Sequence, residues 1–282
     1  MDSQQSKPLI SVLVTSYNRE NYIAQTIESI LSQTYSSFEL IISDNCSTDK
    51  TMKVAEKYAA DPRVSIYQNP VNIGQFPNRN QAASYARGKY LKYVDSDDLI
   101  YPTCLEIMAY AMEKFPEAGW GLYNDQDRVK PHPFVLSPRE AYEYHYFKMP
   151  IFERSPLGSI IKKSVFDAVG GFRDINMAGD FEMWHRLACH YPLVLFGSGI
   201  GWYRVHDSQE MNQYAHFVDQ YSMIRKQYLT SKENPLEESS RLELISKAKS
   251  GLARQVVKNL VKMKFSYTKK LIDLHRAYRQ IN

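Results

Sequence analysis

Short apolar runs alternate with stretches of helical periodicity along the first half of the chain, and few folds accept that alternation. Residues 9–15 (LISVLVT) and 38–44 (FELIISD) are rich in branched apolar side chains, as buried strands are. The stretch between them, residues 22–33, carries isoleucines at helical spacing. A strand, a helix and a second strand in this order predict two parallel strands joined by a crossover helix.

The same pattern continues through the first 125 residues. Further strands are expected at residues 64–68, 90–94 and 119–123, with helices at 50–60, 77–87 and 102–115. Strands that alternate with helices favour a mostly parallel sheet that helices cover on both faces. We therefore predict an α/β fold in which residues 1–125 form a nucleotide-binding half.

The remaining residues show weaker periodicity. Residues 126–160 are rich in proline, tyrosine and histidine, and we interpret them as loops and short pieces over one end of the sheet. Later segments are expected to form helices at 162–169 and 180–190 and strands at 193–197 and 200–205. The predicted organisation is one domain over residues 1–210, with 126–210 as its second half, and a helical appendage over 211–282 with a polar linker at 231–240.

Positive charge is concentrated in this appendage. Residues 241–282 contain eleven Lys or Arg and two acidic residues, a net charge of +9, so the total of +4 leaves −5 for residues 1–240. Cations and apolar residues recur on different sides of the helical stretch. One side carries Arg254, Lys258 and Lys262, and the other carries Leu252, Val256, Val257, Leu260 and Val261. Two interpretations of the basic side remain: it is exposed to solvent, or it contacts an anionic membrane surface. No nucleic-acid-reading motif is present, so we expect no nucleic-acid partner.

Composition excludes several classes of protein. With 44% hydrophobic and 23% charged residues, the chain is neither disordered nor collagenous. No run approaches the roughly 20 apolar residues that cross a bilayer, and the first residues lack a signal-peptide pattern. Three widely spaced cysteines, Cys46, Cys104 and Cys189, are expected to be reduced thiols. We expect a cytoplasmic protein, with a peripheral place on the inner face of the membrane as the alternative that the basic helices allow.

Polar residues follow three of the predicted strands, namely residues 15–18 (TSYN), 44–45 (DN) and 95–98 (DSDD). The carboxyl ends of parallel strands meet at one edge of a sheet, where open α/β folds bind their ligands. The last group is the most informative, because three carboxylates within four residues repel one another unless a cation neutralises them. Oxygen ligands favour Mg²⁺ or Mn²⁺, and hence a substrate with a diphosphate. A helix cap or a solvated loop is the alternative for this acidic turn.

Residues 11–51, which begin SVLVTSYNRENY, and residues 69–98, which end GKYLKYVDSDD, resemble the family 2 glycosyltransferases of the GT-A fold. The likeness extends over about residues 8–206. It implies that a sugar moves, with inversion, from a nucleoside diphosphate sugar to a hydroxyl of a glycan or lipid-linked acceptor. It also implies that residues 126–210 are the acceptor half, and it makes bacterial surface polysaccharide synthesis the expected setting.

Carried over by position, the resemblance assigns a nucleotide pocket. Thr15 and Tyr17 would line the space for the base and ribose, Asp44 would accept a hydrogen bond from the base, and Arg79 would lie near the nucleotide. Surface packing without ligand contact is the alternative for Tyr17 and Arg79.

The resemblance also assigns a metal site. Asp95 and Asp97 match the family's DxD motif, which holds the ribose and the diphosphate-bound metal, and Asp98 is the alternative metal ligand beside Asp97. His206, in the stretch WYRVHDS, matches a position near the metal or the diphosphate, where a neutral imidazole suits Mn²⁺. A histidine with only structural hydrogen bonds is the other interpretation of His206.

The family's catalytic base matches Asp180 in the stretch GGFRDINMAGDFEMWHRL, where Gly179 replaces an acidic residue. Inversion requires a base that takes the proton of the acceptor hydroxyl, and a helix N-terminus would keep this carboxylate ionised. Glu182 is the fallback base, and a helix N-cap is the non-catalytic alternative for Asp180. Residues 156–159 resemble the family's acceptor-side loop, where small residues let a sugar approach the backbone, and Trp184 either stacks on an acceptor sugar or packs in the core.

Two other functions stay open. A domain that binds a nucleotide sugar or a glycan without turnover would fit the missing acidic residue at Gly179. A sugar nucleotidyltransferase would carry a glycine-rich phosphate loop after the first strand, where this chain has TSYNRENY. Release of free nucleoside diphosphate from a mixture of donor and acceptor would separate a transferase from a binding domain.

Overall fold

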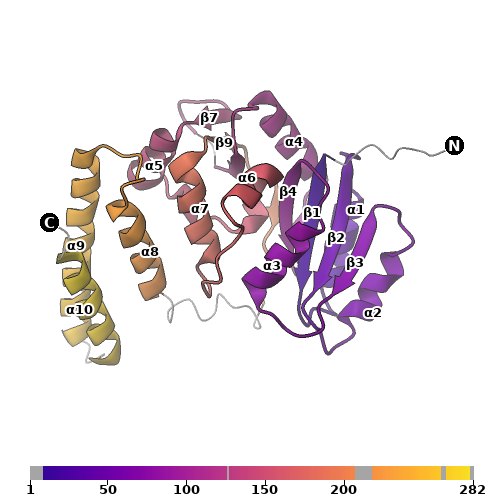
Figure 1. The fold of residues 1–282 in the computed structure, drawn as a ribbon, viewed down its shortest axis with the longest axis horizontal. Helices are drawn as coiled ribbons and strands as arrows, with labels where there is room; N and C mark the ends of the chain where they lie inside the picture. Colours follow the sequence, from indigo (N-terminus) through magenta and orange to yellow (C-terminus); the bar gives the residue numbers. More distant parts are fainter. Residues whose placement is uncertain (1–8, 126, 207–217, 262–264, 280–282) are drawn as a thin grey trace.

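A mixed sheet forms the centre of the computed structural model, which describes residues 9–125, 127–206, 218–261 and 265–279 (Figure 1). The sheet contains eight of the described strands, in the order β3, β2, β1, β4, β8, β6, β9, β7. A separate antiparallel pair joins β5 (Leu99–Ile100) to β10 (Gly201–Trp202). The strands of the main sheet are β1 (Ile10–Ser16), β2 (Phe38–Asp44), β3 (Val64–Gln68), β4 (Tyr90–Asp95), β6 (Trp120–Tyr123), β7 (Phe134–Leu136), β8 (Ser159–Lys162) and β9 (Leu193–Phe196).

The first four strands run parallel, as their sequences predict. β1 lies between β2 and β4, and β2 pairs in turn with β3. The register sets Thr15 opposite Asp95 and Ser16 opposite Asp44, so three polar strand ends meet at one edge of the sheet. Beyond β4 the sheet becomes mixed, because β8 runs antiparallel to both β4 and β6, and β7 runs antiparallel to β9.

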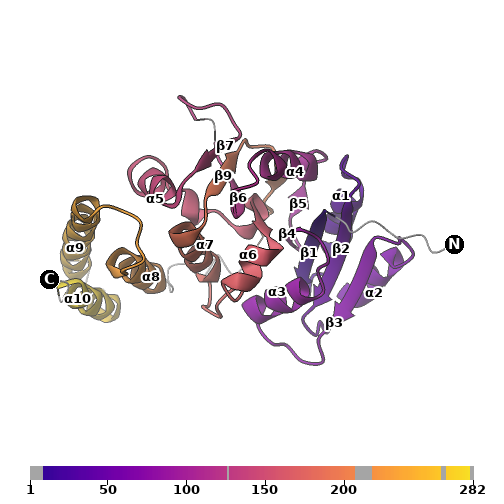
Figure 2. The ribbon, with the colours of Figure 1, turned by 45° about the horizontal axis from the view of Figure 1, so that its top comes forward.

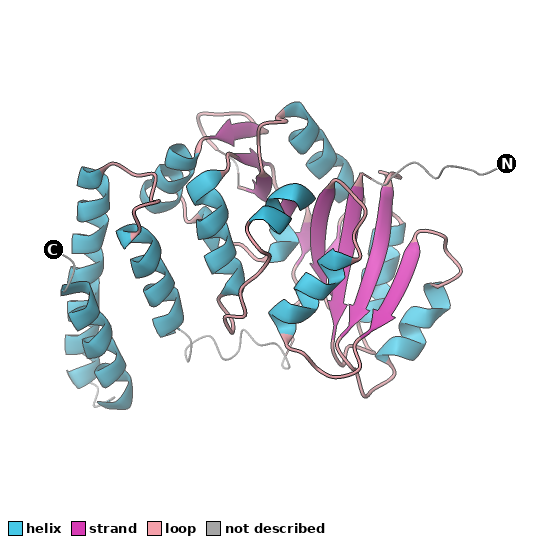
Figure 3. Cartoon of the chain, in the orientation of Figure 1, coloured by secondary structure: helices cyan, strands magenta, loops and turns pink. Residues whose placement is uncertain are grey.

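Helices cover both faces of the sheet (Figures 2 and 3). One buried core joins Val12 and Val14 of β1 to the helices α1 and α4, and the other joins Leu13 of the same strand to α3, α5 and α7. This alternation follows from the two-residue period of a strand. The helices are α1 (Ile23–Leu31), α2 (Thr51–Ala55), α3 (Gln75–Ser84), α4 (Cys104–Lys114), α5 (Pro138–Phe147), α6 (Lys163–Ala168), α7 (Gly179–His190), α8 (Val218–Thr230), α9 (Glu238–Val261) and α10 (Phe265–Arg279).

Residues 126–160 contain more regular structure than the loops and short pieces that the sequence predicts. Strand β7 and helix α5 both lie within it. The helix begins with a capping box, in which the Ser137 hydroxyl accepts from the amide of Glu140 and the Glu140 carboxylate accepts from the amide of Ser137. Strand β8 was also missed, and the strand expected at 200–205 is confined to the two residues of β10.

The C-terminal helices pack on the second half of the sheet domain. Buried side chains of α8, α9 and α10 belong to the same core as α7, and α9 and α10 lie side by side at the end of the molecule opposite β3 (Figures 1 and 2). The polar break expected as a linker is a turn in which Asn234 and Leu236 are buried. Among the residues predicted to form the apolar and basic sides of the appendage, Leu252 is buried and Arg254 is exposed. The side chains of Val256, Val257, Lys258, Leu260, Val261 and Lys262 lie outside the described residues.

Among the described helices, none is both long and apolar enough to cross a membrane.

Candidate active site

One large cavity, of about 1100 Å³, opens at the carboxyl edge of β1 and β4. It extends from the strand ends within the first 125 residues to the start of α7. Six of the nine site residues that the sequence predicts line this cavity: Thr15, Tyr17, Arg79, Asp95, Asp97 and Asp180. The fold thus brings together residues that are up to 165 positions apart in the chain.

Arg79 is the buried cation of the cavity. Its side chain is on α3, only 2% of the residue is exposed, and its Nη2 donates to Asp95 Oδ1 at 2.7 Å. The guanidinium also lies over the rings of Phe76 and Phe172, at 5.3 and 5.8 Å from their centroids. Within the described part of the chain, its Nε has no hydrogen-bond partner although it is buried. Such an unpaired donor at a cavity is available to a ligand oxygen.

Asp97 is held by two side chains at the same carboxylate oxygen. Arg19 Nε donates to Asp97 Oδ2 at 2.8 Å, and His206 Nε2 lies 3.0 Å from that atom. The His206 ring in turn stacks on Tyr22, with centroids 4.8 Å apart. Arg19 and Arg79 therefore offset the charge of the acidic turn within the chain, so that charge alone does not require a metal. Among the described residues, no group of three or more Asp, Glu, His or Cys forms a metal cluster.

Asp98, the last residue of the acidic turn, is buried and does not line the cavity. It is 1% exposed, its Oδ1 accepts from the backbone amide of Arg204 at 3.0 Å, and burial, assisted by the neighbouring Asp95, raises its pKa to about 8. Lys92, which interacts electrostatically with Asp98, is fully buried and donates from Nζ to the carbonyl of Leu157. Burial lowers the pKa of Lys92 to about 8. Of the two alternative metal ligands, Asp97 is thus the one that lines the cavity.

Asp44 is also apart from the cavity. It is fully buried, and its carboxylate accepts from Ser16 Oγ at 3.0 Å, from the amide of Ser47 at 2.8 Å and from Gln68 Nε2 at 3.2 Å. These bonds fix the loop that follows β2. The next residue, Asn45, is the one from this strand end that lines the cavity.

Asp180 lies in the first turn of α7, with Ala178 and not Asp180 at the N-cap. Its Oδ1 accepts from the backbone amide of Phe181 at 2.7 Å. Burial raises the pKa of Asp180 to about 6, and the nearby charge of Arg79 opposes this increase. A carboxyl group with this pKa is mostly ionised at pH 7 and accepts a proton readily, as a general base must.

Gly179 leaves room for an aromatic ring beside this turn. A Cβ atom at position 179 would lie 2.6 Å from Cζ of Phe76, which is closer than side-chain atoms approach. The ring of Phe76 therefore occupies the space that an acidic side chain would need.

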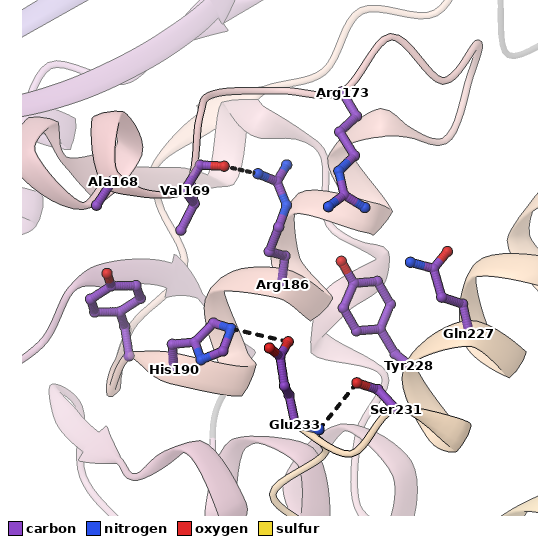
Figure 4. A pocket seen from close by; sticks show the side chains of 10 residues that line it. Ala168, Val169, Arg173, Arg186, His190, Gln227, Tyr228, Ser231 and Glu233 are labelled. Carbon is purple, nitrogen blue, oxygen red and sulfur yellow. Dashed lines mark hydrogen bonds and ion pairs between the residues drawn. The ribbon is translucent and has the colours of Figure 1, made fainter.

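Glu182, the fallback base, is not placed to act as one. It is fully buried, and its carboxylate accepts from Tyr228 Oη at 2.6 Å and from Arg186 Nη2 at 2.8 Å, with Arg173 Nη1 at 2.9 Å. Arg173, Arg186 and Tyr228 line a second cavity of about 330 Å³ between α7 and α8 (Figure 4). The carboxylate thus joins two helices.

Trp184 packs in the core instead of facing an acceptor. It is fully buried, its ring stacks on Trp120 with centroids 5.5 Å apart, and its Nε1 donates to the carbonyl of Arg154. Residues 156–159, expected as a loop, form a short 3-10 helix (Pro156–Gly158) and the first residue of β8, and Pro156 among them lines the cavity.

Several cavity residues were missed at the level of sequence. Arg19 lies in the loop after the first strand and Tyr203 lies near His206, so proximity to predicted residues was a usable signal for both. Three residues of α8 had no such signal, because that helix lies in the stretch interpreted as an appendage. They are Tyr221, Ser222 and Arg225.

Comparison with known proteins agrees with the family resemblance seen in the sequence. Residues 11–170 match the family described as Glycosyl transferase family 2. EpsE of Bacillus subtilis is 41% identical over 111 residues, which are 39% of this chain and 40% of EpsE. TuaG of the same organism is 41% identical over 137 residues, 47% of this chain and 54% of TuaG. WcaA of Escherichia coli is 28% identical over 201 residues, 66% of this chain and 68% of WcaA. The chain thus spans about half or less of the length of EpsE and TuaG.

Solved structures share the fold. S. aureus TarS in complex with UDP-GlcNAc superposes with a TM-score of 0.64 at 20% identity, over 82% of this chain and 69% of that one. The mannosyltransferase PcManGT from Pyrobaculum calidifontis, in complex with GDP-Man and Mn²⁺, gives a TM-score of 0.56 at 18% identity, over 98% of this chain and 87% of that one. The predicted α/β GT-A fold, with a mostly parallel sheet flanked by helices, is confirmed.

Proposed function

The chain belongs to glycosyl transferase family 2, and we propose that it is an inverting glycosyltransferase that uses a nucleoside diphosphate sugar. The acceptor is a hydroxyl group of a glycan or of a lipid-linked glycan. The observation that carries the proposal is that Thr15, Tyr17 and Asp95, the residues proposed for the nucleotide, line the same cavity as Asp180.

The donor would occupy the side of the cavity formed by the strand ends. Thr15 and Tyr17 line the space for the base and ribose, and Tyr17, which is 43% exposed, offers a ring face to the nucleotide. Asp44 is buried, so it would act on the nucleotide indirectly, by fixing the loop that contains Asn45. The arginines Arg19 and Arg79 supply positive charge to the diphosphate.

Asp180 would act as the general base of a single displacement. Its carboxylate takes the proton of the acceptor hydroxyl as the hydroxyl oxygen forms a bond to the anomeric carbon. The bond between that carbon and the diphosphate oxygen breaks at the same time, and the nucleoside diphosphate leaves with the electron pair. Attack opposite the leaving group inverts the anomeric configuration.

Asp97 and His206 fit a divalent cation such as Mg²⁺ or Mn²⁺. A carboxylate oxygen and an imidazole nitrogen lie 3.0 Å apart there, and both are ligand types that Mn²⁺ accepts. When bound, such an ion supplies positive charge that stabilises the departing diphosphate. PcManGT was solved with Mn²⁺, which supports testing this ion first.

The setting we propose is the synthesis of a bacterial surface polysaccharide. WcaA is named for colanic acid biosynthesis and TuaG for teichuronic acid biosynthesis. A growing polysaccharide on a lipid carrier would bring the enzyme to the cytoplasmic side of a membrane.

The basic helices α9 and α10 would then contact anionic lipid. Their exposed cations include Lys247, Arg254, Lys269, Lys270 and Arg276. The variant K247E/K269E/R276E should lose co-sedimentation with phosphatidylglycerol vesicles, whereas K53E/K57E/K114E, which reverses three exposed cations on the other half of the molecule, should keep it. Equal sedimentation of both variants would reject membrane contact through these helices.

Binding and turnover are tested separately. A thermal-shift screen of UDP-, GDP- and dTDP-sugars, with and without Mn²⁺, identifies the donor. Incubation of that donor with a panel of octyl glycosides should then release free nucleoside diphosphate, and nuclear magnetic resonance of the product should show the inverted anomer. A donor that stabilises the protein but releases no diphosphate with any acceptor would favour a non-catalytic binding domain.

A further inference from the structure

Helix α8 forms part of the wall of the active-site cavity. Tyr221, Ser222 and Arg225 of this helix line the cavity together with Asp180, although they follow Asp180 by more than 40 residues. The helix packs against α7 in the same buried core (Figures 1 and 2). A helix from the C-terminal region is thus built into the proposed catalytic centre.

Tyr221 holds the turn that precedes the base. Its hydroxyl donates to the carbonyl of Met177, in the turn before α7. Met177 has φ of +62°, a left-handed conformation that residues other than glycine rarely adopt. It is followed directly by Ala178, the N-cap of α7. A strained residue keeps its conformation only where surrounding contacts fix it, and this hydrogen bond is such a contact.

The same tyrosine also packs against the residue that follows the base. The rings of Tyr221 and Phe181 have centroids 5.2 Å apart, and the guanidinium of Arg225 lies 5.7 Å from the centroid of Phe181. Phe181 is 1% exposed, and its amide donates to Asp180 Oδ1. Tyr221 therefore contacts the chain on both sides of Asp180.

Helix α8 is held in place by contacts with α10 and with Glu153. Tyr278 of α10, 1% exposed, donates from its hydroxyl to the carbonyl of Ser222 at 3.3 Å. Arg225 forms an ion pair at 3.5 Å with Glu153, which also lines the cavity. The position of Tyr221 thus depends on the packing of the C-terminal helices.

We propose that Tyr221 is a positioning residue for Asp180, so that α8 sets where the general base points toward the acceptor. This inference rests on the proposed function, in which Asp180 takes the proton of the acceptor hydroxyl. It assigns to the C-terminal helical region a part in catalysis in addition to any part in membrane contact.

The test is Tyr221→Phe, which removes one hydroxyl and keeps the ring. The matched control is Tyr228→Phe on the same helix, where the lost hydroxyl bonds to Glu182 of α7 and faces the second cavity (Figure 4). We expect kcat of Tyr221→Phe to fall by about tenfold to a hundredfold, with the donor KM within about twofold of wild type, because misplacement of a reacting group has effects of that size. Tyr228→Phe should lower the melting temperature and keep kcat. Wild-type kcat in Tyr221→Phe, or an equal loss in both variants, would overturn the proposal.

A second measurement needs no substrate. The amide of Glu182 donates to the carbonyl of Ala178 at 3.0 Å, in the first turn of α7. Hydrogen exchange in peptides that cover residues 175–183 should be about tenfold faster in Tyr221→Phe than in wild type, and unchanged in peptides from β1 and β4. Unchanged exchange at the start of α7 would reject the positioning role. Failure of the wild type to release nucleoside diphosphate would reject the proposed function, and the exchange experiment would still decide whether Tyr221 fixes this turn.

Discussion

Replacing Asp180 with Asn should abolish sugar transfer and make the protein more stable at neutral pH. The carboxyl group has an ordinary pKa of 3.8, and burial at the start of α7 raises its pKa to about 6 in the folded protein. The folded state therefore binds this proton more tightly than the unfolded state does. Stability from this group is fully present below pH 3.8 and is lost as the pH rises through about 6. An Asn side chain keeps the shape, carries no charge and still accepts from the amide of Phe181.

The size of the effect follows from the two pKa values. A shift from 3.8 to about 6 corresponds to about 3 kcal/mol of lost stability at pH 7.5 and to about half of that at pH 5. Because Asp180 lines an open cavity, solvent screening reduces this value, and we expect Asp180→Asn to gain about 1 to 3 kcal/mol at pH 7.5. For a chain of this size, each kcal/mol raises the melting temperature by roughly 2 to 4 °C.

The assay is thermal unfolding of wild type and Asp180→Asn at pH 7.5 and pH 5, together with transfer activity and donor binding at pH 7.5. The variant should melt higher at pH 7.5, the difference should shrink at pH 5, and the donor should bind with similar affinity. Equal melting temperatures at pH 7.5 would refute the argument that the ionised carboxylate is buried at a cost. Near wild-type transfer by the variant would refute its role as the base.

Three further outcomes follow from the same site. The transfer rate of the wild type should be about tenfold lower at pH 5 than at pH 7, because a protonated Asp180 accepts no proton, and a flat profile over this range would contradict the assignment. Asp97→Ala should weaken donor binding and its dependence on Mn²⁺ together in calorimetric titrations, and an unchanged effect of Mn²⁺ would exclude Asp97 as a ligand. Gly179→Ala should lose about 1 to 3 kcal/mol in denaturant unfolding, because its Cβ would meet the Phe76 ring at 2.6 Å, whereas Gly251→Ala on α9, with open space around it, should be neutral or stabilising. Equal stability of the two glycine variants would show that the ring moves away freely.

The strands of the first 125 residues could be predicted because β1, β2 and β4 are buried on both faces, whereas β3, at the edge of the sheet, is only partly buried. The sequences of β1, β2 and β4 are nearly continuous apolar runs. β2 and β3 match the expected ranges, β1 is shifted by one residue at both ends, and β4 extends one residue further than expected. Parallel pairing in turn fixes which strand ends meet. That Thr15 and Asp95 lie at the same edge of the sheet therefore follows from the sequence pattern, whereas their direct pairing depends on the strand order, which the sequence did not predict.

The second half was less predictable, because part of its buried core is made of tyrosine and histidine side chains. Helix α5 buries Tyr142, Tyr144 and His145, residues that a simple apolar pattern counts as polar. Each ring is buried while its polar atom finds a partner; Tyr144, for example, donates from its hydroxyl to Asp127 at 2.7 Å. The capping box at Ser137 is a signal that can be read from the sequence. The contact of α8 with the cavity has no sequence signal, because it depends on how distant helices pack.

The departure at Gly179 is explained by the packing around it. The resemblance to other family members implies an acidic residue at this position, and a second carboxylate there would raise the pKa of Asp180 further by repulsion. Glycine admits the ring of Phe76 instead, and that ring lies under the guanidinium of Arg79, 5.3 Å from its centroid. Arg79 is thereby held in the cavity, where it pairs with Asp95 and opposes the increase in the pKa of Asp180. Asp180, the proposed base, is thus flanked by a cation where the family pattern implies an anion, and this cation favours its ionised form near neutral pH.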